Sequence, residues 1–207
     1  MQKIITVGRE FGSGGRELAK RLADELGVAY YDREIITEIA KKASLDENYV
    51  AQALEQGTYA AFPLTFSRSF ASYAAAPTGN AQLLGMEQRV VRELAQKGDC
   101  IFVGRSADVV LRDYHPLRLF VYADMEARVA RCKARAAAGE HYTDREYERL
   151  INQMDKNRAQ NYALLSDTRW GDRQGYDLCI NTTDLSPKTA APLIAAYARA
   201  WFGENCG

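Results

Sequence analysis

A glycine-rich turn near the start of the chain has the composition of a phosphate-binding loop. Glycine lets the backbone approach an anion closely, and the N–H groups at the start of a following helix point toward it. The stretch from Gly8 to Glu17 therefore predicts a site for the phosphates of a nucleoside triphosphate. The candidate contacts are Gly8, Gly12, Ser13, Gly14, Gly15, Arg16 and Glu17. An ordinary tight turn is the alternative, because such turns are also rich in glycine.

The turn departs from the standard pattern G-x-x-x-x-G-K-[ST] at the positions that carry its charge and its magnesium ligand. Arg16 and Glu17 follow Gly15, where the pattern has a lysine and a hydroxyl residue. We expect Arg16 to supply the missing cation, although its planar group cannot simply occupy a lysine's place. Mg²⁺ would be held by Ser13, by Glu17, or mostly by phosphates and water.

Strands and helices alternate around this turn. Short apolar runs predict strands, and amphipathic stretches between them predict helices. The expected strands are KIITVG at the start, VAYYD, CIFVG (100–104), RLFVYA (118–123) and YDLCINT (176–182). Strands that are apolar throughout and separated by helices indicate an α/β domain with a mainly parallel sheet, whose ligands bind at the carboxyl ends of the strands. The glycine-rich turn lies at such an end.

Several helix boundaries carry recognisable capping residues. Ser44 with Glu47, and Thr143 with Glu146, have the spacing of capping boxes. Gly27 is the expected stop of the first helix. The other expected helices cover residues 34–43, 45–56 and 125–138, a segment beginning at 143, and the stretch from 186 to about 203.

The overall composition argues against several classes of protein. Among 207 residues, 27 basic side chains balance 27 acidic ones, so the net charge gives no reason to expect nucleic acid or an anionic membrane as a partner. The N-terminus lacks the pattern of a signal peptide, and the longest uncharged run is interrupted by Pro77 and Gly79. We therefore expect a cytoplasmic protein. The four cysteines have no C-x-x-C spacing and are expected to be free thiols.

Residues 58–80 are almost uncharged and carry aromatic side chains at helical spacing. The stripe consists of Tyr59, Phe62, Phe66, Phe70 and Tyr73. It favours packing inside a small helical lobe. A homodimer surface and a wall of a substrate site are the alternatives.

The sequence GREFGSGGRELAKRLADELGVAYYDREII (8–36) resembles the N-terminal signature of the cytidylate kinase-like family, relatives of the P-loop nucleoside monophosphate kinases. Cytidylate kinases have G-S-G-K-G-T where this chain has G-S-G-G-R-E at 12–17, and the latter form is typical of this branch. The resemblance implies a single kinase-like domain over 1–207 with a P-loop NTPase-type three-layer α/β/α fold. It also implies a helical acceptor-binding lobe over about 34–85 and an arginine-bearing lid over about 131–158.

The same resemblance implies roles for residues later in the chain. FVGRSAD matches a segment whose arginine grips the acceptor phosphate, so Arg105 inherits this role, with Asp108 orienting it or meeting a base amino group. Asp32 matches the acid that precedes the acceptor-site helix, although an ordinary helix cap is the alternative. DKNRAQNY contains the family's D-x-x-R, so Arg158 is expected to contact the acceptor phosphate or the transition state, with Asp155 as its orienter or as a base contact.

Two basic segments could supply the lid. They contain Arg128, Arg131, Lys133 and Arg135, and then Arg145, Arg149, Lys156 and Arg158. A charge run of this kind is often only a solvated helix face. By resemblance, lid arginines close over the transferring phosphoryl group, neutralise its charge and exclude water, and we expect Arg131, Arg16 and Arg158 to act catalytically.

The glycine-rich loop predicts use of ATP with Mg²⁺, and the resemblance implies transfer of its γ-phosphoryl group to a nucleoside monophosphate, with CMP or dCMP as the first expectation. Two alternatives remain open. A nucleotide-binding regulatory protein without turnover is favoured by the missing lysine and hydroxyl. A P-loop kinase for another small acceptor is the other, because fold does not fix substrate.

Overall fold

A five-stranded parallel sheet forms the centre of the protein. The computed structural model describes residues 2–55, 77–136 and 142–203. Its strands are β1 (Ile4–Arg9), β2 (Ala29–Tyr31), β3 (Cys100–Val103), β4 (Leu117–Tyr122) and β5 (Leu178–Asn181). They lie in the order β2-β3-β1-β4-β5, and each neighbouring pair is parallel. The expected mainly parallel sheet is confirmed, with β1 at its centre.

Helices follow the strands along the chain. They are α1 (Gly15–Leu26), α2 (Glu34–Ala43), α3 (Glu47–Glu55), α4 (Pro77–Ala95), α5 (Ala107–Val110), α6 (Met125–Ala134), α7 (Asp144–Ala163) and α8 (Pro187–Trp201). Two 3-10 turns, η1 (Arg112–Tyr114) and η2 (Arg173–Gly175), complete the regular elements. Within the ranges that the structure describes, none of these helices combines the length and apolar character needed to cross a membrane.

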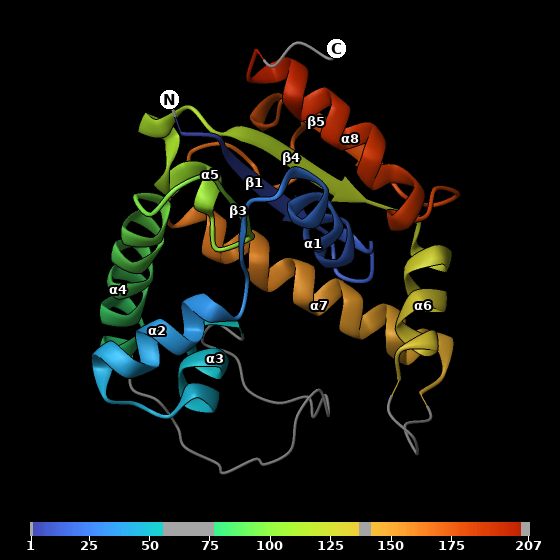
Figure 1. Ribbon diagram of the computed structural model, residues 1–207. Coiled ribbons are helices and arrows are strands. Elements are labelled where there is room, and N and C mark those ends of the chain that lie inside the picture. The colour runs from blue at the N-terminus through green and yellow to red at the C-terminus, as the bar shows by residue number, and fades with distance from the viewer. Residues whose placement is uncertain (1, 56–76, 137–141, 204–207) are drawn as a thin grey trace.

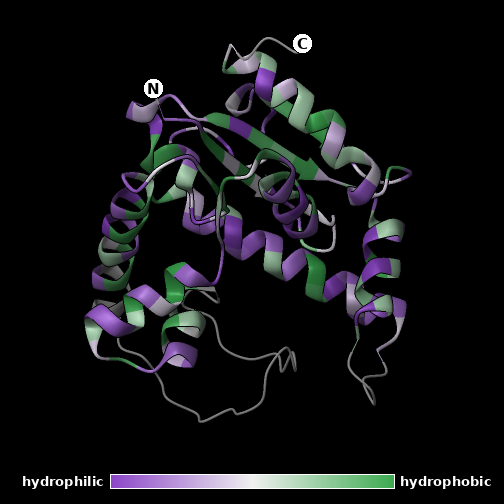
Figure 2. Cartoon of the chain, in the orientation of Figure 1, coloured by the Kyte–Doolittle hydropathy of each residue, from purple (hydrophilic) through white to green (hydrophobic). Residues whose placement is uncertain are grey.

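Alternate residues of the central strands face opposite helical layers. Ile5 and Val7 of β1 pack with the buried faces of α1 and α8, whereas Ile4 packs with residues of α2, α4 and α5. Figure 1 shows α1 and α8 side by side on one face of the sheet. In Figure 2 the strands between the layers are mostly coloured as hydrophobic. The three-layer α/β/α fold expected from the sequence is therefore confirmed.

Helices α2, α3 and α4 pack against one another beside the sheet. Ile35 and Ile39 of α2, Val50 of α3 and Val90 of α4 are buried in one shared core. In Figure 1 these helices lie on the opposite side of the view from α6. They occupy the region expected to form the acceptor lobe. The aromatic stripe expected within residues 58–80 lies outside the described residues, so its packing stays a prediction.

Of the two capping boxes expected from the sequence, the structure contains one. Thr143 and Glu146 form the expected capping box at the start of α7. The box expected from Ser44 is wrong, because Ser44 adopts a left-handed φ of 55° and ends α2. Asp46 caps α3 instead, accepting backbone hydrogen bonds from Asn48 at 2.9 Å and from Tyr49 at 3.2 Å. A side-chain oxygen at this position satisfies helix donors that have no carbonyl partner.

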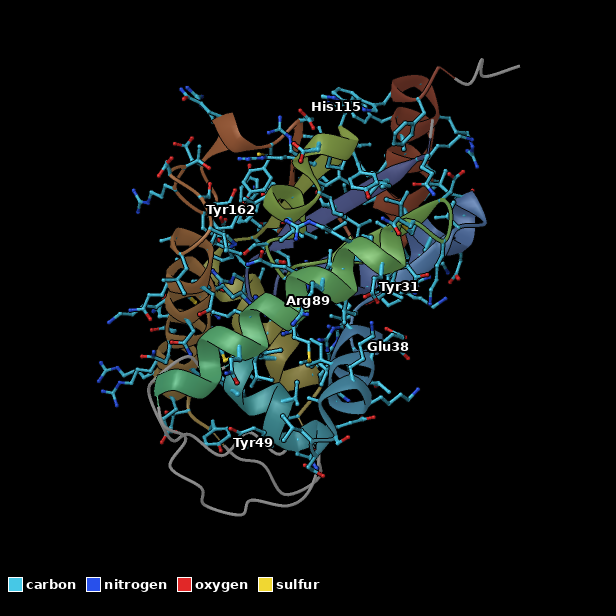
Figure 3. The ribbon with its side chains drawn as sticks, turned by 90° about the vertical axis from the view of Figure 1, so that its left-hand side faces the viewer. Tyr31, Glu38, Tyr49, Arg89, His115 and Tyr162 are labelled. Atoms are coloured by element: carbon cyan, nitrogen blue, oxygen red, sulfur yellow. The ribbon has the colours of Figure 1, made fainter. Side chains whose placement is uncertain are left out.

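Within the described residues, the cysteines are free thiols. They are Cys100, Cys132 and Cys179, as expected, and Cys206 lies outside the described residues. Burial raises the pKa of Cys100 to about 12, so its thiol stays protonated at neutral pH. Among the described residues, no group of three or more His, Cys, Asp and Glu side chains could hold a metal. Figure 3 shows His115 at the opposite end of the view from Tyr49 of α3.

Candidate active site

The glycine-rich turn has the backbone geometry of an anion-binding loop. Gly12 and Gly14 have φ values of 79° and 82°, which residues with side chains rarely adopt. Gly14 is the N-cap of α1, so the positive end of that helix lies at the carboxyl end of β1, where an anion is stabilised. Gly8 is required for another reason, because a Cβ there would lie 2.8 Å from Phe120 Cδ2.

Ser13 is buried inside this loop and fixes its shape. Its hydroxyl donates to the Glu10 carbonyl at 2.9 Å and lies 3.4 Å from the Gly15 nitrogen, whose hydrogen it accepts. On the other side, the Thr182 hydroxyl lies 2.6 Å from the Ser13 carbonyl oxygen and 3.0 Å from that of Tyr122. Ser13, expected as one candidate magnesium ligand, therefore has its hydroxyl committed to the loop itself.

The Thr182 contact predicts a measurable stability effect. Thr182→Val should lower the free energy of unfolding by roughly 1–3 kcal/mol, because the buried Ser13 carbonyl loses its hydroxyl donor. Thr183→Val is the matched control, because the two contacts of the Thr183 hydroxyl, which donates to Asn181 and accepts the Asp124 N–H, both lie in exposed positions. Urea denaturation would measure both variants. An equal loss of unfolding free energy in the two variants would show that the buried Thr182 contact stabilises the fold no more than an exposed one.

A buried arginine of α6 ties the loop to α7. Arg128 Nε donates to the Phe11 carbonyl at 2.7 Å. Its guanidinium also pairs with Glu10 at 3.2 Å and with Asp155. Asp155 in turn accepts the Phe11 N–H at 2.7 Å. Both backbone polar groups of Phe11 are therefore held from outside the loop, and the sequence alone presented Arg128 only as one member of a basic run.

Arg158 extends from α7 toward the carboxyl end of β1. Its Nη1 donates to the Arg9 carbonyl at 3.0 Å and lies 3.5 Å from Asp155 Oδ1. Its guanidinium carbon lies 5.5 Å from the ring centre of Phe11. The i, i+3 spacing places Asp155 and Arg158 on one helix face. Asp155 is thus in position to orient Arg158, which is one of the two roles expected for it.

Arg105 forms a buried ion pair at the carboxyl end of β3. Its Nη1 lies 3.2 Å from Glu87 Oε1, and each of the two side chains is 8% exposed. Because Glu87 belongs to α4, the pair connects the sheet to the helical lobe. Asp108, the acid expected to orient Arg105, accepts a hydrogen bond from the Tyr162 hydroxyl at 2.8 Å. Burial raises the pKa of Asp108. Asp108 thus links α5 to the end of α7, where Figure 3 labels Tyr162.

Arg16 points toward the end of β2. Its Nε lies 2.6 Å from Asp32 Oδ2, and its side chain is 53% exposed. Asp32, in contrast, is buried. Arg16, which was expected to contact ATP, and Asp32, which was expected at the acceptor site, therefore form one ion pair.

Arg9, the last residue of β1, lies among these charges. Its side chain is 13% exposed, and its Nη2 is 4.0 Å from Asp32 Oδ1. The pKa of Arg9 is lowered to about 9, first by burial and then by repulsion from Arg158, Arg105 and Arg16, which the attraction of Asp32 does not offset. Cations that repel one another are stabilised by an added anion. These four arginines, here called the arginine cluster, are therefore suited to hold phosphate.

Arg131 of α6 lies against the glycine-rich loop. Its guanidinium donates to the Thr182 carbonyl, and its Nε is 3.9 Å from the position that a Cβ on Gly14 would take. Its Nη1 is buried and has no hydrogen-bond partner within the part of the chain that the structure describes. An unsatisfied buried donor beside a phosphate loop is a candidate contact for an anion.

A known family model matches most of the chain. Residues 4–184 match the model of the cytidylate kinase-like family, which is most of the 207 residues. The chain belongs to the cytidylate kinase-like family. Together with the three-layer fold, this membership makes the protein a P-loop kinase.

This family member is similar in sequence or in fold to several known proteins. A cytidylate kinase of Methanopyrus kandleri is 24% identical over 203 residues, which cover 93% of this chain and 91% of that protein. An uncharacterized protein from Eubacterium ventriosum has a solved structure with a TM-score of 0.70 at 24% identity, covering 96% of this chain and 99% of its own. A shikimate kinase from Bacteroides thetaiotaomicron has a TM-score of 0.59 at 13% identity, with 98% and 99% covered.

In this cytidylate kinase-like protein, the candidate magnesium ligands are already engaged in other contacts. Glu17, the other candidate magnesium ligand, has one oxygen 2.9 Å from Arg21 Nε and the other 2.6 Å from Arg135 Nη2. Both of its oxygens are therefore already paired. Mg²⁺ that accompanies ATP would be carried by phosphate oxygens and water, ligands that this ion commonly retains.

Three side chains of the site were not identified from the sequence of this family member. Arg9 directly follows Gly8 at the end of the central strand, a position that could have marked it. Glu87 and Thr182 gave no such local signal, because each acts on a residue far away in the chain.

Proposed function

We propose that this protein transfers the γ-phosphoryl group of ATP to a nucleoside monophosphate, with CMP or dCMP as the expected acceptors. The observation that carries the proposal is the arginine cluster beside the glycine-rich loop. It joins the ends of β1, β2 and β3 to α1 and α7, and through Glu87 to the helical lobe. Two anionic substrates must approach each other in this reaction, and such a concentration of cations lowers their repulsion.

Donor and acceptor would use different parts of the site. The loop from Gly8 to Glu17 would hold the phosphates of ATP, and Arg131 would meet them through its buried Nη1. On the acceptor side, Arg105 and Arg158 would hold the monophosphate, with Asp32 positioning the cluster. The helices α6 and α7, which carry Arg131 and Arg158, would serve as the lid.

The chemistry requires positioning and charge neutralisation more than bond-making groups on the protein. An oxygen of the acceptor phosphate attacks the γ-phosphorus of ATP. As that bond forms, the bond from the γ-phosphorus to its bridging oxygen breaks, and ADP leaves with the electron pair. Mg²⁺ supplies further neutralisation of the phosphate charge when it is bound with ATP.

A panel of acceptors tests this proposal. The protein would be given ATP and Mg²⁺ with CMP, dCMP, UMP, AMP or shikimate, and ADP release would be followed in a coupled assay. The fastest release is expected with CMP or dCMP. Release that depends on shikimate alone would indicate a kinase for another acceptor, and ATP binding without release would favour a regulatory protein.

Arg105 provides a prediction for the acceptor side. Arg105→Ala should raise the KM for the monophosphate about tenfold or more, because a hydrogen bond to a charged group contributes about 1.5–3 kcal/mol. The affinity for ATP should change little. Arg105→Lys keeps the charge beside Glu87 and is the control for the buried ion pair. An unchanged KM in a folded Arg105→Ala protein would remove Arg105 from the acceptor site.

A further inference from the structure

The side chain of Arg9 occupies the space from which a standard P-loop extends its lysine. The lysine of the cytidylate kinase pattern falls at the position of Gly15. A Cβ on Gly15 would lie 2.6 Å from the Cβ of Arg9 and 3.2 Å from its Cγ. Non-bonded carbon atoms do not approach so closely. A lysine on the loop and the present arginine on β1 therefore exclude each other.

A second glycine accommodates the other end of Arg9. A Cβ on Gly104 would lie 1.6 Å from Arg9 Nη1 and 2.7 Å from its Cζ. The guanidinium therefore lies over the carboxyl end of β3, directly before Arg105. With its stem beside the loop and its charged end next to Arg105, Arg9 runs from the donor side of the site to the acceptor side.

Arg16 is less well placed for the lysine's task. Its side chain is 53% exposed and directed to Asp32 at 2.6 Å, whereas the side chain of Arg9 is 13% exposed. A fixed cation acts more strongly on a phosphate when it is shielded from water. The Arg16–Asp32 pair instead borders Arg9, since Asp32 Oδ1 lies 4.0 Å from Arg9 Nη2.

We infer that Arg9 supplies the cation that a standard P-loop carries on its lysine, and that it contacts the outer phosphates of ATP. Gly15 and Gly104 are the two positions that make room for it. The inference rests on the proposed use of ATP as phosphoryl donor, but not on the identity of the acceptor. Arg16 then holds Asp32 in place and acts on the phosphates only indirectly.

Binding of ATP and ADP without any acceptor tests the inference. Titration calorimetry with Mg²⁺ should show Arg9→Met weakening ATP binding about tenfold, which corresponds to about 1.4 kcal/mol. ADP binding should weaken by a smaller factor than ATP binding, because ADP lacks the γ-phosphate and loses only the contact to its β-phosphate. Arg9→Lys should retain part of the ATP affinity. Arg112→Ala, whose side chain is 78% exposed, should bind both nucleotides as the wild type does.

Exchange of the two positions gives the sharpest test. Arg9→Gly/Gly15→Lys removes the nearest obstacle at the loop position and returns a lysine to its standard place. Val121 Cβ, 3.1 Å from the new Cβ, has to move by only a few tenths of an ångström. Arg9→Gly alone should bind ATP more weakly than the wild type. The double variant should recover at least about half of that loss, measured as the change in the logarithm of the dissociation constant. Circular dichroism would confirm that each variant is folded. If Arg9→Met does not fold, the comparison between Arg9→Gly and the double variant decides.

The outcomes separate this inference from the proposed function. A folded Arg9→Met protein that binds ATP as tightly as the wild type would overturn the role of Arg9, even if CMP is phosphorylated. An Arg9-dependent preference for ATP over ADP in a protein that phosphorylates no monophosphate would support Arg9 and reject the proposed acceptor. Failure of the wild type to bind ATP would overturn both.

Discussion

Arg158→Ala is expected to lower kcat by about 30- to 1,000-fold, because losing a charge that meets the phosphoryl group mainly in the transition state costs roughly 2–4 kcal/mol. Arg158 is held for this task by the Arg9 carbonyl and by Asp155. Steady-state ADP release at saturating ATP and the best monophosphate would measure the effect. A loss confined to KM would mean that Arg158 binds the acceptor equally well in the ground state and in the transition state.

Lys156→Ala is the matched control for this variant. Lys156 lies on the same helix and is exposed, so its removal should leave kcat within about twofold, as for most surface substitutions. Arg158→Lys should recover only part of the rate, because an ammonium cannot reproduce the planar contacts of a guanidinium. Full activity of Arg158→Ala would remove α7 from the catalytic machinery.

Arg128→Ala should lower the free energy of unfolding by about 3–5 kcal/mol, as is usual when one partner of a buried ion pair is removed. The arginine side chain is 6% exposed, and its loss leaves Glu10 and Asp155 without a shared cation. The midpoint of urea denaturation would measure the change. Because Phe11 loses an anchor as well, affinity for ATP should fall in the folded fraction.

Arg112→Ala is the control for the stability measurement. Arg112 is 78% exposed beside Asp113, so its replacement should change the free energy of unfolding by less than about 0.5 kcal/mol. A loss below about 1 kcal/mol for Arg128→Ala would mean that α6 and α7 do not depend on this arginine. The loop would then be fixed mainly by Ser13 and Thr182.

The sheet and most of its helices were predictable because their signals are local, whereas α4 and α5 were not expected from the sequence. Apolar runs such as CIFV fix β3, and the Thr143–Glu146 spacing fixes the start of α7. The prediction that Ser44 caps α3 was wrong because Asp46, two residues later, can cap the same helix. The tight turn after α2 uses Ser44 to end one helix and leaves Asp46 to begin the next.

The site was predictable only in part because its contacts are long-range. The loop and the D-x-x-R segment carry short patterns, and Asp155 and Arg158 do meet beside Phe11. The choice between Arg16 and Arg9 depended on which side chain is buried, and no sequence spacing contains that information. The pairing of Arg105 with Glu87 likewise depends on how α4 packs against β3.

Nucleotide analysis after incubation with ATP, Mg²⁺ and CMP tests the proposed function most directly. Separation of the products by ion-exchange chromatography should give ADP and CDP in equal amounts, with both strongly reduced in Arg158→Ala. ADP without CDP would mean that water, not the monophosphate, accepts the phosphoryl group. If none of CMP, dCMP, UMP and AMP is converted into its diphosphate, a nucleoside monophosphate kinase is contradicted.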